Sequence, residues 1–346
     1  MKAKLLKLKP SSRFHFGRPM TDSDTSLTET DEFVHSDVLF SALIHNLSTV
    51  KSKEEVDQFI LGFENGDIKI SSGFYCLEDK KTTDTEKQYV FFLPRPVHSV
   101  NTVDINEYDK IKQVKRIKFI DIALLDKKSR DWTLNSTFAI DPSSLATLGG
   151  NEEDLSLYHK GIATHVGIRN KSEEITINTG GPFRVSYISI SDLSEHGLLV
   201  HFYFLYEVLD SKYESDFELA VELLSYNGIG GERSSGYGKI DAIETIHSLP
   251  KRFFDQQHAG VQMTLSKVVP KKEEMELLTY YTHSIRGGRE TTKGTLKSVE
   301  MLNEGAVVQK GITGHLVDIS IEENRSYLRN GKAFCIGLSN NLVDEE

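Results

Sequence analysis

Short segments with alternating or continuous apolar residues predict β-strands in the part of the chain before Pro250. The segment GLLVHFYFLY is rich in β-branched and aromatic residues, which pack well on a pleated surface. The segment YVFFLPRPV ends at Pro94 and Pro96, because proline has no N–H to donate to a neighbouring strand. The predicted strands are residues 4–8, 67–75, 89–97, 197–206 and 239–246.

Two further segments carry apolar residues three and four positions apart and predict α-helices. In HSDVLFSALIHNLSTV, residues 35–50, Ser36 is the expected N-cap. In SDFELAVELLSYN, residues 215–227, Ser215 and Glu218 form a capping box. The resulting order is strand–helix–strand, insertion, strand–helix–strand, which is the βαββαβ order of a ferredoxin-like domain.

The domain organisation follows from where this regularity is lost and regained. Periodicity weakens from about residue 98 to residue 182, which predicts a large insertion in the first domain. Leu249 and Pro250 mark a boundary. Beyond it, a predicted helix at 271–281 and several strands indicate a second, smaller α+β domain. We therefore predict domains at residues 1–248 and 249–346.

Charge and composition exclude several classes of protein. The chain has 41 Lys and Arg against 51 Asp and Glu, a formal net charge of −10. This acidity argues against a general nucleic-acid coat and against an anionic membrane surface, but it allows a local basic groove. Cys76 and Cys335 form no C-x-x-C pair, which suits a reducing compartment. There is no apolar run of about 18 residues and no export signal, so we expect a cytoplasmic protein without a membrane partner.

The segment NGIGGERSSGYGKI, residues 227–240, carries the strongest candidate chemistry. A Walker A loop needs lysine where Tyr237 stands, and a dinucleotide loop needs glycine where Arg233 stands, so neither nucleotide motif is present. Two interpretations remain, a tight glycine turn or a clamp for a nucleic-acid backbone. In a clamp, backbone N–H groups would form an anion-binding nest, helped by the Arg233 fork and the hydroxyls of Ser234 and Ser235. Basic residues that would extend such a track are Arg95, Arg169, Arg184 and those of segment 110–118.

Six sets of segments, spread over nearly the whole chain, form a recognisable combination. They are HFG (15–17), VHSDVLFSALIHNL (34–47), SSGFY with FFLPRP (71–75, 91–96), GIRN…TGGPFRV (167–185), GIGGERSSGYGKI (228–240) and YLRNGKAFCIGL (327–338). The glycine loop combined with HSD-LFSAL is specific. Together these segments resemble the RAMP superfamily, and among its members the crRNA 5′-handle-binding subunit of type III-A (Csm) CRISPR effector complexes.

This resemblance implies two ferredoxin-like (RRM-like) domains, a thumb-like hairpin in the insertion, and a scaffold without catalytic activity, metal or cofactor. It implies three partners: the 5′ handle of crRNA, a large polymerase-like signature subunit and an adjacent backbone RAMP subunit. It also implies that the chain is not a homo-oligomer. Candidate RNA-binding residues carried over from the resemblance are His35, Ser36, Arg169, Asn170, Gly228, Gly230, Gly231, Arg233, Ser234, Ser235, Gly236 and Gly238.

Catalysis is the alternative function. Some RAMP proteins process CRISPR repeat RNA without metal, using histidine as general acid or base, and His15, His35 and His45 lie near the first strand and helix. A target-cleaving subunit would use an aspartate after the first strand, where Asp22, Asp24 and Asp31 stand. Metal chemistry has the least support, because the chain has no HExxH motif and no cysteine cluster.

Overall fold

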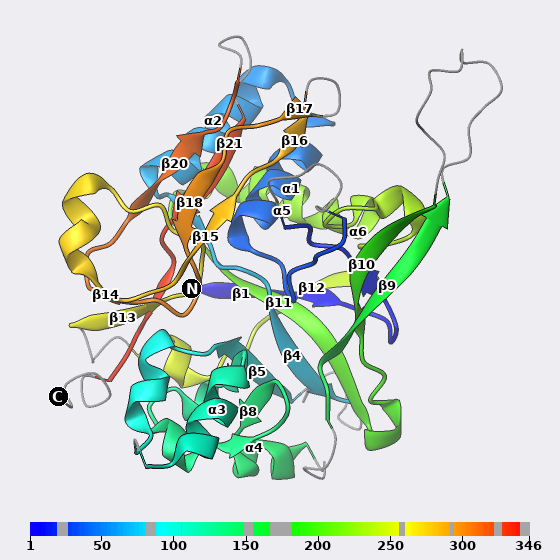
Figure 1. Ribbon diagram of the computed structural model, residues 1–346. Helices are drawn as coiled ribbons and strands as arrows, with labels where there is room; N and C mark the ends of the chain where they lie inside the picture. Colours follow the sequence, from blue (N-terminus) through cyan, green and yellow to red (C-terminus); the bar gives the residue numbers. More distant parts are fainter. Residues whose placement is uncertain are drawn as a thin grey trace.

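The computed structural model is an α+β protein organised around one large, mostly antiparallel sheet (Figure 1). This confirms the fold class predicted from the sequence. The structure describes residues 1–18, 27–80, 88–104, 106–148, 155–166, 182–255, 260–290, 294–321 and 327–339. Within these ranges, no helix is both long and apolar enough to cross a lipid bilayer.

One half of the sheet has the strand order β12–β1–β11–β4, with neighbouring strands antiparallel. Helices connect β1 to β4 and β11 to β12, so these four strands follow the βαββαβ order. Their bounds are β1 (Lys2–Lys7), β4 (Phe74–Asp79), β11 (Leu198–Val208) and β12 (Ala242–Ile246). Strands that extend this sheet are β3 (Ile68–Ile70), β5 (Tyr89–Pro94), β6 (Phe119–Asp121), β7 (Thr133–Leu134) and β8 (Phe138–Ile140).

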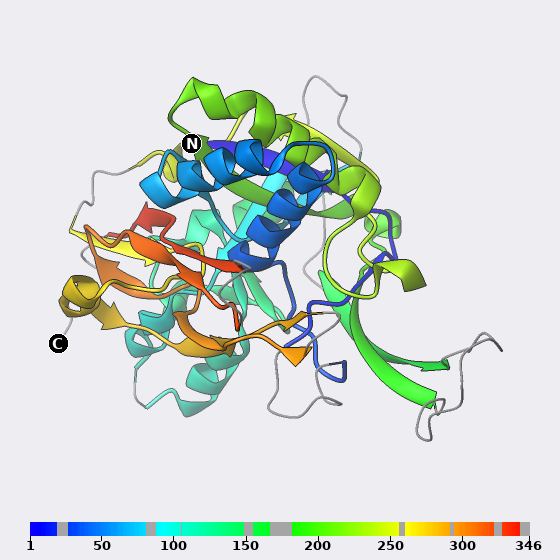
Figure 2. The same ribbon diagram turned by 90° about the horizontal axis from the view of Figure 1, so that it is seen from above.

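Helices cover one face of this sheet (Figures 1 and 2). They are α1 (Ser36–Ser48), α2 (Lys53–Asn65), α5 (Glu214–Glu222) and α6 (Leu224–Asn227). The sequence analysis missed α2, although Ser52 and Glu55 form a complete capping box at its start. The predicted capping box of Ser215 and Glu218 is wrong: α5 begins one residue earlier, and Glu218 pairs with Lys4 on β1 instead.

Both faces of the sheet are buried, because successive residues of its strands enter different cores. On β4, Tyr75 and Leu77 pack under the helices. Phe74 and Cys76 face the opposite core, where residues of the C-terminal segment such as Phe253 join them. A ferredoxin-like sheet that binds RNA on an open face needs exposed aromatic residues there, and this sheet offers no such face among its described strands.

The insertion contributes two different structures. Its first part contributes residues to both cores and contains α3 (Tyr108–Arg116), whose Val114 packs in the core opposite α1, and α4 (Pro142–Thr147). Its second part is a long antiparallel hairpin of β9 (Tyr158–Val166) and β10 (Pro182–Ile190), which projects from the body of the protein (Figure 1). At its base, β10 also pairs with β2 (Arg13–Phe14).

The C-terminal segment forms a sheet of order β14–β19–β13–β22 and three hairpins, β15–β18, β16–β17 and β20–β21. The bounds are β13 (Val261–Thr264), β14 (Leu278–Tyr280), β15 (His283–Arg286), β16 (Arg289–Glu290), β17 (Gly294–Thr295), β18 (Val299–Leu302), β19 (Val307–Gln309), β20 (Gly314–Asp318), β21 (Leu328–Lys332) and β22 (Cys335–Gly337).

The α-helix predicted at residues 271–281 of this segment is wrong. Residues Lys272–Leu277 form a 3-10 helix, and Leu278 already begins β14. Glu274 lies within this 3-10 helix, and its carboxylate accepts hydrogen bonds from the N–H of Lys271 and of Thr313, which tie the segment to a distant loop. The described residues from 249 to 339 contain no α-helix, so a second ferredoxin-like domain is not confirmed.

Candidate nucleic-acid interface

The glycine-rich loop begins where α6 ends, and helix packing fixes its starting point. Gly228 is the C-cap of α6, with φ 68° and ψ −176°, a conformation that is essentially restricted to glycine. The side-chain amide of Asn227 donates to that of Asn46 at 2.8 Å, which attaches this end of α6 to α1. The loop therefore leaves a buried, well-defined helix end.

Backbone hydrogen bonds close the loop and attach it to the strand after β1. The N–H of Ile229 donates to the carbonyl of Gly238 at 2.9 Å, and the N–H of Gly238 donates to that of Arg13 at 2.7 Å. A Cβ on Gly228 would lie 2.6 Å from the Gly238 carbonyl oxygen, and one on Gly238 would meet the Ile229 carbonyl. Gly228 and Gly238 therefore allow the loop to close, in agreement with the interpretation of the segment as a tight glycine turn.

The middle of the loop is different, because it is exposed to solvent. Residues Arg233–Ser235 form a 3-10 turn between Glu232 and Gly236, both in the left-handed region. A Cβ on Gly236 would meet no atom within 4 Å. Within the described chain, the N–H groups of Arg233 and Ser234 donate no hydrogen bond. Exposed N–H groups, two hydroxyls and a guanidinium on one turn are suited to an anionic oxygen.

A cavity of about 250 Å³ lies beside this turn, between the loop, residues 15–17 after β2, and α1. Arg233 lines it from the loop, and His45 lines it from the last turn of α1. The Arg233 guanidinium makes only a 3.3 Å contact with the Asn227 carbonyl, so it is available for a ligand. The exposed turn therefore presents the Arg233 guanidinium, a strong hydrogen-bond donor, to this cavity.

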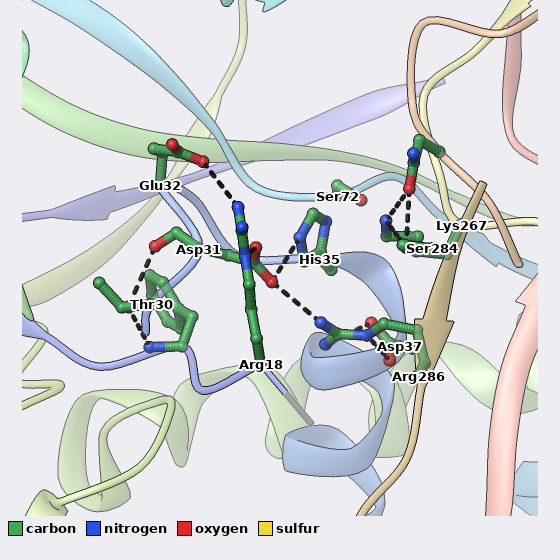
Figure 3. Close-up of polar contacts among 12 residues, drawn as sticks. Arg18, Thr30, Asp31, Glu32, His35, Asp37, Ser72, Lys267, Ser284 and Arg286 are labelled. Atoms are coloured by element: carbon green, nitrogen blue, oxygen red, sulfur yellow. Dashed lines mark hydrogen bonds and ion pairs between the residues drawn. The ribbon is translucent and has the colours of Figure 1, made fainter. Parts of the chain in front are cut away.

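Two of the predicted RNA-binding residues, Ser36 and His35, lie in the interior and make contacts within the protein. Ser36 is fully buried, and its hydroxyl accepts a hydrogen bond from the N–H of Lys267 at 2.9 Å. It is not the N-cap of α1, which is His35. The Nε2 of the buried His35 ring lies 3.0 Å from the carboxylate of Asp31 (Figure 3). Its Nδ1 lies 2.8 Å from the carboxylate of Glu304. Ser36 and His35 are thus both buried, and both ring nitrogens of His35 face carboxylates, so their contact with RNA stays a prediction.

These residues belong to a buried ionic network that joins α1 to the C-terminal segment. Arg286 lies between the two aspartates, 2.9 Å from Asp31 and 3.1 Å from Asp37 (Figure 3). Arg329 pairs with Asp37 at 2.6 Å. Burial opposes ionisation of Asp37, but the two arginines outweigh it and hold the pKa of that carboxyl well below its usual range. The network positions α1, and through Asn46 the start of the glycine loop.

A cavity of about 570 Å³ opens beside this network and is lined by both signs of charge. Glu32 pairs with Lys160 at 2.7 Å and with Lys118 at 3.8 Å, and Asp31 pairs with Arg18. Arg18 and Lys118, two of the cations that line this cavity, are therefore paired with carboxylates. Among the described residues, no group of His, Cys, Asp or Glu is placed to hold a metal ion.

The extended basic track predicted from the sequence is not continuous with the loop. Segment 110–118 lies mostly in α3, which packs through Val114 on the core opposite α6. Arg95 donates to the carbonyls of Ile117 and Pro96 and so braces its own loop. Arg184 lies exposed on β10. Arg169 and Asn170 lie outside the described residues.

Comparison with known proteins extends these observations. The family described as the CRISPR Csm4 C-terminal domain matches residues 257–338. A Csm4 protein of the CRISPR system of Methanocaldococcus jannaschii is 26% identical, over 92% of this chain and 89% of the relative. The resemblance to the Csm branch of the RAMP superfamily is confirmed.

Solved structures show the same fold. A chain of the Csm3–Csm4 subcomplex of a type III-A CRISPR-Cas interference complex superposes with a TM-score of 0.69 and 21% identity, covering 98% of this chain and all of the other. A chain of a Csm1–Csm4 cassette bound to cA4 superposes with a TM-score of 0.55 and 15% identity, covering 98% of both chains. The likeness thus extends over the full fold, well beyond residues 257–338.

Proposed function

We propose that this chain is a non-catalytic RNA-binding scaffold subunit of a cytoplasmic type III-A CRISPR interference complex. In that role it grips the 5′ repeat-derived handle of crRNA and works in antiviral defence. The Csm4 relative and the Csm4-containing solved structures support the class of complex. The exposed turn Arg233–Ser235 carries the proposal, because it combines free backbone donors with a cation beside a cavity.

The mode of binding follows from the chemistry of the turn. Its donors suit phosphate oxygens and make no distinction between bases, so the loop holds the RNA backbone. The exposed candidates for this contact are Gly231, Arg233, Ser234, Ser235 and Gly236. Gly228, Gly230 and Gly238 contribute indirectly by keeping the turn in place.

The proposed partners are proteins that meet this chain on two other surfaces. The solved relatives include a complex named for Csm1 and Csm4 and one named for Csm3 and Csm4. We propose that the large signature subunit and one backbone subunit bind here in the same way. The domain division at residues 1–248 and 249–346 is part of the proposal, with the ionic network around Asp37 and Arg286 as the contact between the two.

The absence of catalysis is proposed from the surroundings of the histidines near the first helix. His35 is held between two carboxylates. His15 is buried, with Nδ1 2.7 Å from the Ser186 carbonyl oxygen. His45 is the third histidine near the first helix, and unlike His15 and His35 it is exposed. General acid–base cleavage of RNA needs an acid and a base that both reach the substrate.

Co-purification tests this function. We expect the chain, expressed with its genomic neighbours, to bring down short RNAs that share one 5′ sequence. The purified chain should bind that handle RNA more tightly than an RNA with the handle sequence scrambled, and should leave both uncut with or without divalent metal. Specific cleavage of a repeat RNA, abolished by His45→Ala or His35→Ala, would favour the endoribonuclease instead. Absence of both RNA and partners would refute the proposal.

A further inference from the structure

Segment 108–130 of the insertion presents an exposed basic face, and we propose that this face docks on an acidic surface of a partner protein. The basic face consists of α3 and of the turn at residues 127–130. The inference rests on the proposed function, because it assigns one of the two protein-binding surfaces to a particular place on this chain.

Charge is strongly segregated along this chain. Segment 108–130 contains eight Lys and Arg against three Asp and no Glu, a net charge of +5. The whole chain has a net charge of −10, so the residues outside this segment carry −15. A local surface whose sign is opposite to that of the rest of the molecule attracts an oppositely charged partner and orients it.

The cations of α3 have no counter-charge within the protein. Lys112, Lys115 and Arg116 are exposed, and among the described residues none of them pairs with a carboxylate. Lys112 lies three residues before Lys115 and four before Arg116, a spacing at which like charges repel each other on a helix. The helix dipole favours Lys115 and Arg116 in the last turn, but it does not favour Lys112. Carboxylates of a partner would relieve this repulsion.

Packing and hydrogen bonds hold the basic face in place. Val114 is fully buried in the core opposite α1 and anchors α3 there. The amino group of Lys110 donates to the carbonyl of Arg130, which joins α3 to the turn. The indole N–H of Trp132 donates to the carbonyl of Lys127 at 3.1 Å and supports that turn from below. Because the backbone is already ordered, little conformational entropy is lost when a partner binds.

The chemistry of the basic face favours a protein over a nucleic acid. Tyr108 is the exposed aromatic residue of this segment, and Lys112 already covers its ring at 4.3 Å, so no open π-face is offered to a base. The segment contains no glycine and so has no bare turn like the one at Arg233–Ser235. It also lies on the side of the sheet away from α1 and α6 (Figure 1).

The test measures how tightly the purified full chain binds handle RNA and each proposed protein partner, the large signature subunit and a backbone subunit, at several salt concentrations. We expect the double variant Lys112→Glu with Lys115→Glu to bind one of these proteins about tenfold more weakly, with a reduced salt dependence, because like charges then face each other. Its affinity for handle RNA should be unchanged.

Three further variants control this result. Lys297→Glu with Lys310→Glu makes the same change of charge at exposed positions of the C-terminal segment, and should not weaken binding of that protein. Lys112→Arg with Lys115→Arg keeps the charge and should bind like wild type. Lys112→Ala with Lys115→Ala removes the charge without disfavouring the helix, and should weaken binding of the same protein to a smaller degree. A melting temperature within error of wild type shows that each variant is folded.

Two results would overturn the inference and leave the proposed function intact. In the first, the charge-reversed variant of α3 binds both proteins as tightly as the control variant does, and the basic face is only a solvated surface. In the second, the reversal weakens binding of handle RNA, which would make this face a nucleic-acid contact. In a third outcome the wild-type chain binds neither protein, and the proposed function fails as well.

Discussion

At the scale of single residues, His35 illustrates how a polar motif residue becomes part of the structure. Burial alone would lower its pKa, but the carboxylates of Glu304 and Asp31 outweigh both burial and the nearby Lys267 and raise the pKa above the ordinary histidine value. Burial opposes ionisation of Glu304, but His35 and Lys267 outweigh it and hold the pKa of that carboxyl at about 2. Arg286 pairs with Asp31, one of the two carboxylates beside His35.

This arrangement predicts a pH-dependent stability. Since the folded-state pKa of His35 is raised, its stabilising contribution is fully present below the unfolded-state pKa and is lost as pH rises through the folded value. The carboxylates have lowered pKa values, so their contribution is constant above their unfolded-state range. His35→Gln should therefore cost about 3 kcal/mol near pH 6 and less as pH rises.

Urea unfolding of both proteins from pH 5.5 to 9 measures this difference. His45→Gln is the matched control, because His45 lies on the same helix α1 but is exposed. We expect that variant to differ little from wild type at any pH. If the difference in unfolding free energy between wild type and His35→Gln grew with pH, His35 would not be the protonated group that this argument requires.

The sequence could identify His35 and Ser36 as members of a specific motif, but it could not show what they contact. Their partners Glu304 and Lys267 lie more than 230 residues away along the chain. No local pattern encodes such a pairing, because it depends on how the C-terminal segment packs against α1. Arg233, Ser234 and Ser235 were easier to place, since glycines on both sides force a turn and polar residues inside it face solvent.

At the scale of the element, the glycine loop separates into parts with different roles, and substitutions should reveal them. Gly228→Ala should destabilise the protein by about 2 kcal/mol, because alanine is disfavoured at that φ and ψ and its Cβ would contact the Gly238 carbonyl. Gly236→Asn should fold normally, since asparagine tolerates the left-handed region and the space is open. It should nevertheless weaken handle-RNA binding by obstructing the turn.

Arg233→Ala tests the charge on this element. It should weaken RNA affinity and reduce the slope of log affinity against log salt by about one unit. Lys115→Ala removes the same charge from an exposed position of α3, on the opposite side of the sheet, and should leave the slope unchanged. Equal effects of the two variants would mean that the loop is only a turn.

Most elements with a strong apolar pattern were predicted. Strands β1, β5, β11 and β12 and helix α1 lie where the sequence predicted them, whereas the strand predicted at residues 67–75 is divided between β3 and the start of β4, and α2 was missed. The segment around Glu274 shows the limit. Its composition favours a helix, but tertiary hydrogen bonds from Thr313 hold it as a single turn before β14. Propensity is outweighed there by contacts that no local pattern contains.

At the scale of the whole molecule, burial of both sheet faces determines where partners can bind. The helices cover one face, and the insertion with the C-terminal segment covers the other (Figure 2). The glycine loop, where we propose that RNA binds, lies outside both covered faces. The chain as a whole has a net charge of −10, which disfavours RNA binding away from such a local site.

This division predicts the place of the chain in its complex. In the proposed function, the glycine loop holds one end of a guide, and two further surfaces bind two unlike neighbours. The chain should therefore enter the complex once, beside several copies of the backbone subunit, and should not close into a homo-oligomer. Native mass spectrometry of the co-expressed complex measures this ratio directly. The matched sample is the chain expressed alone, which should be monomeric because its RNA and both neighbours are missing. A stable homodimer in that sample, or several copies per guide RNA in the complex, would be incompatible with a subunit that caps one end of a filament.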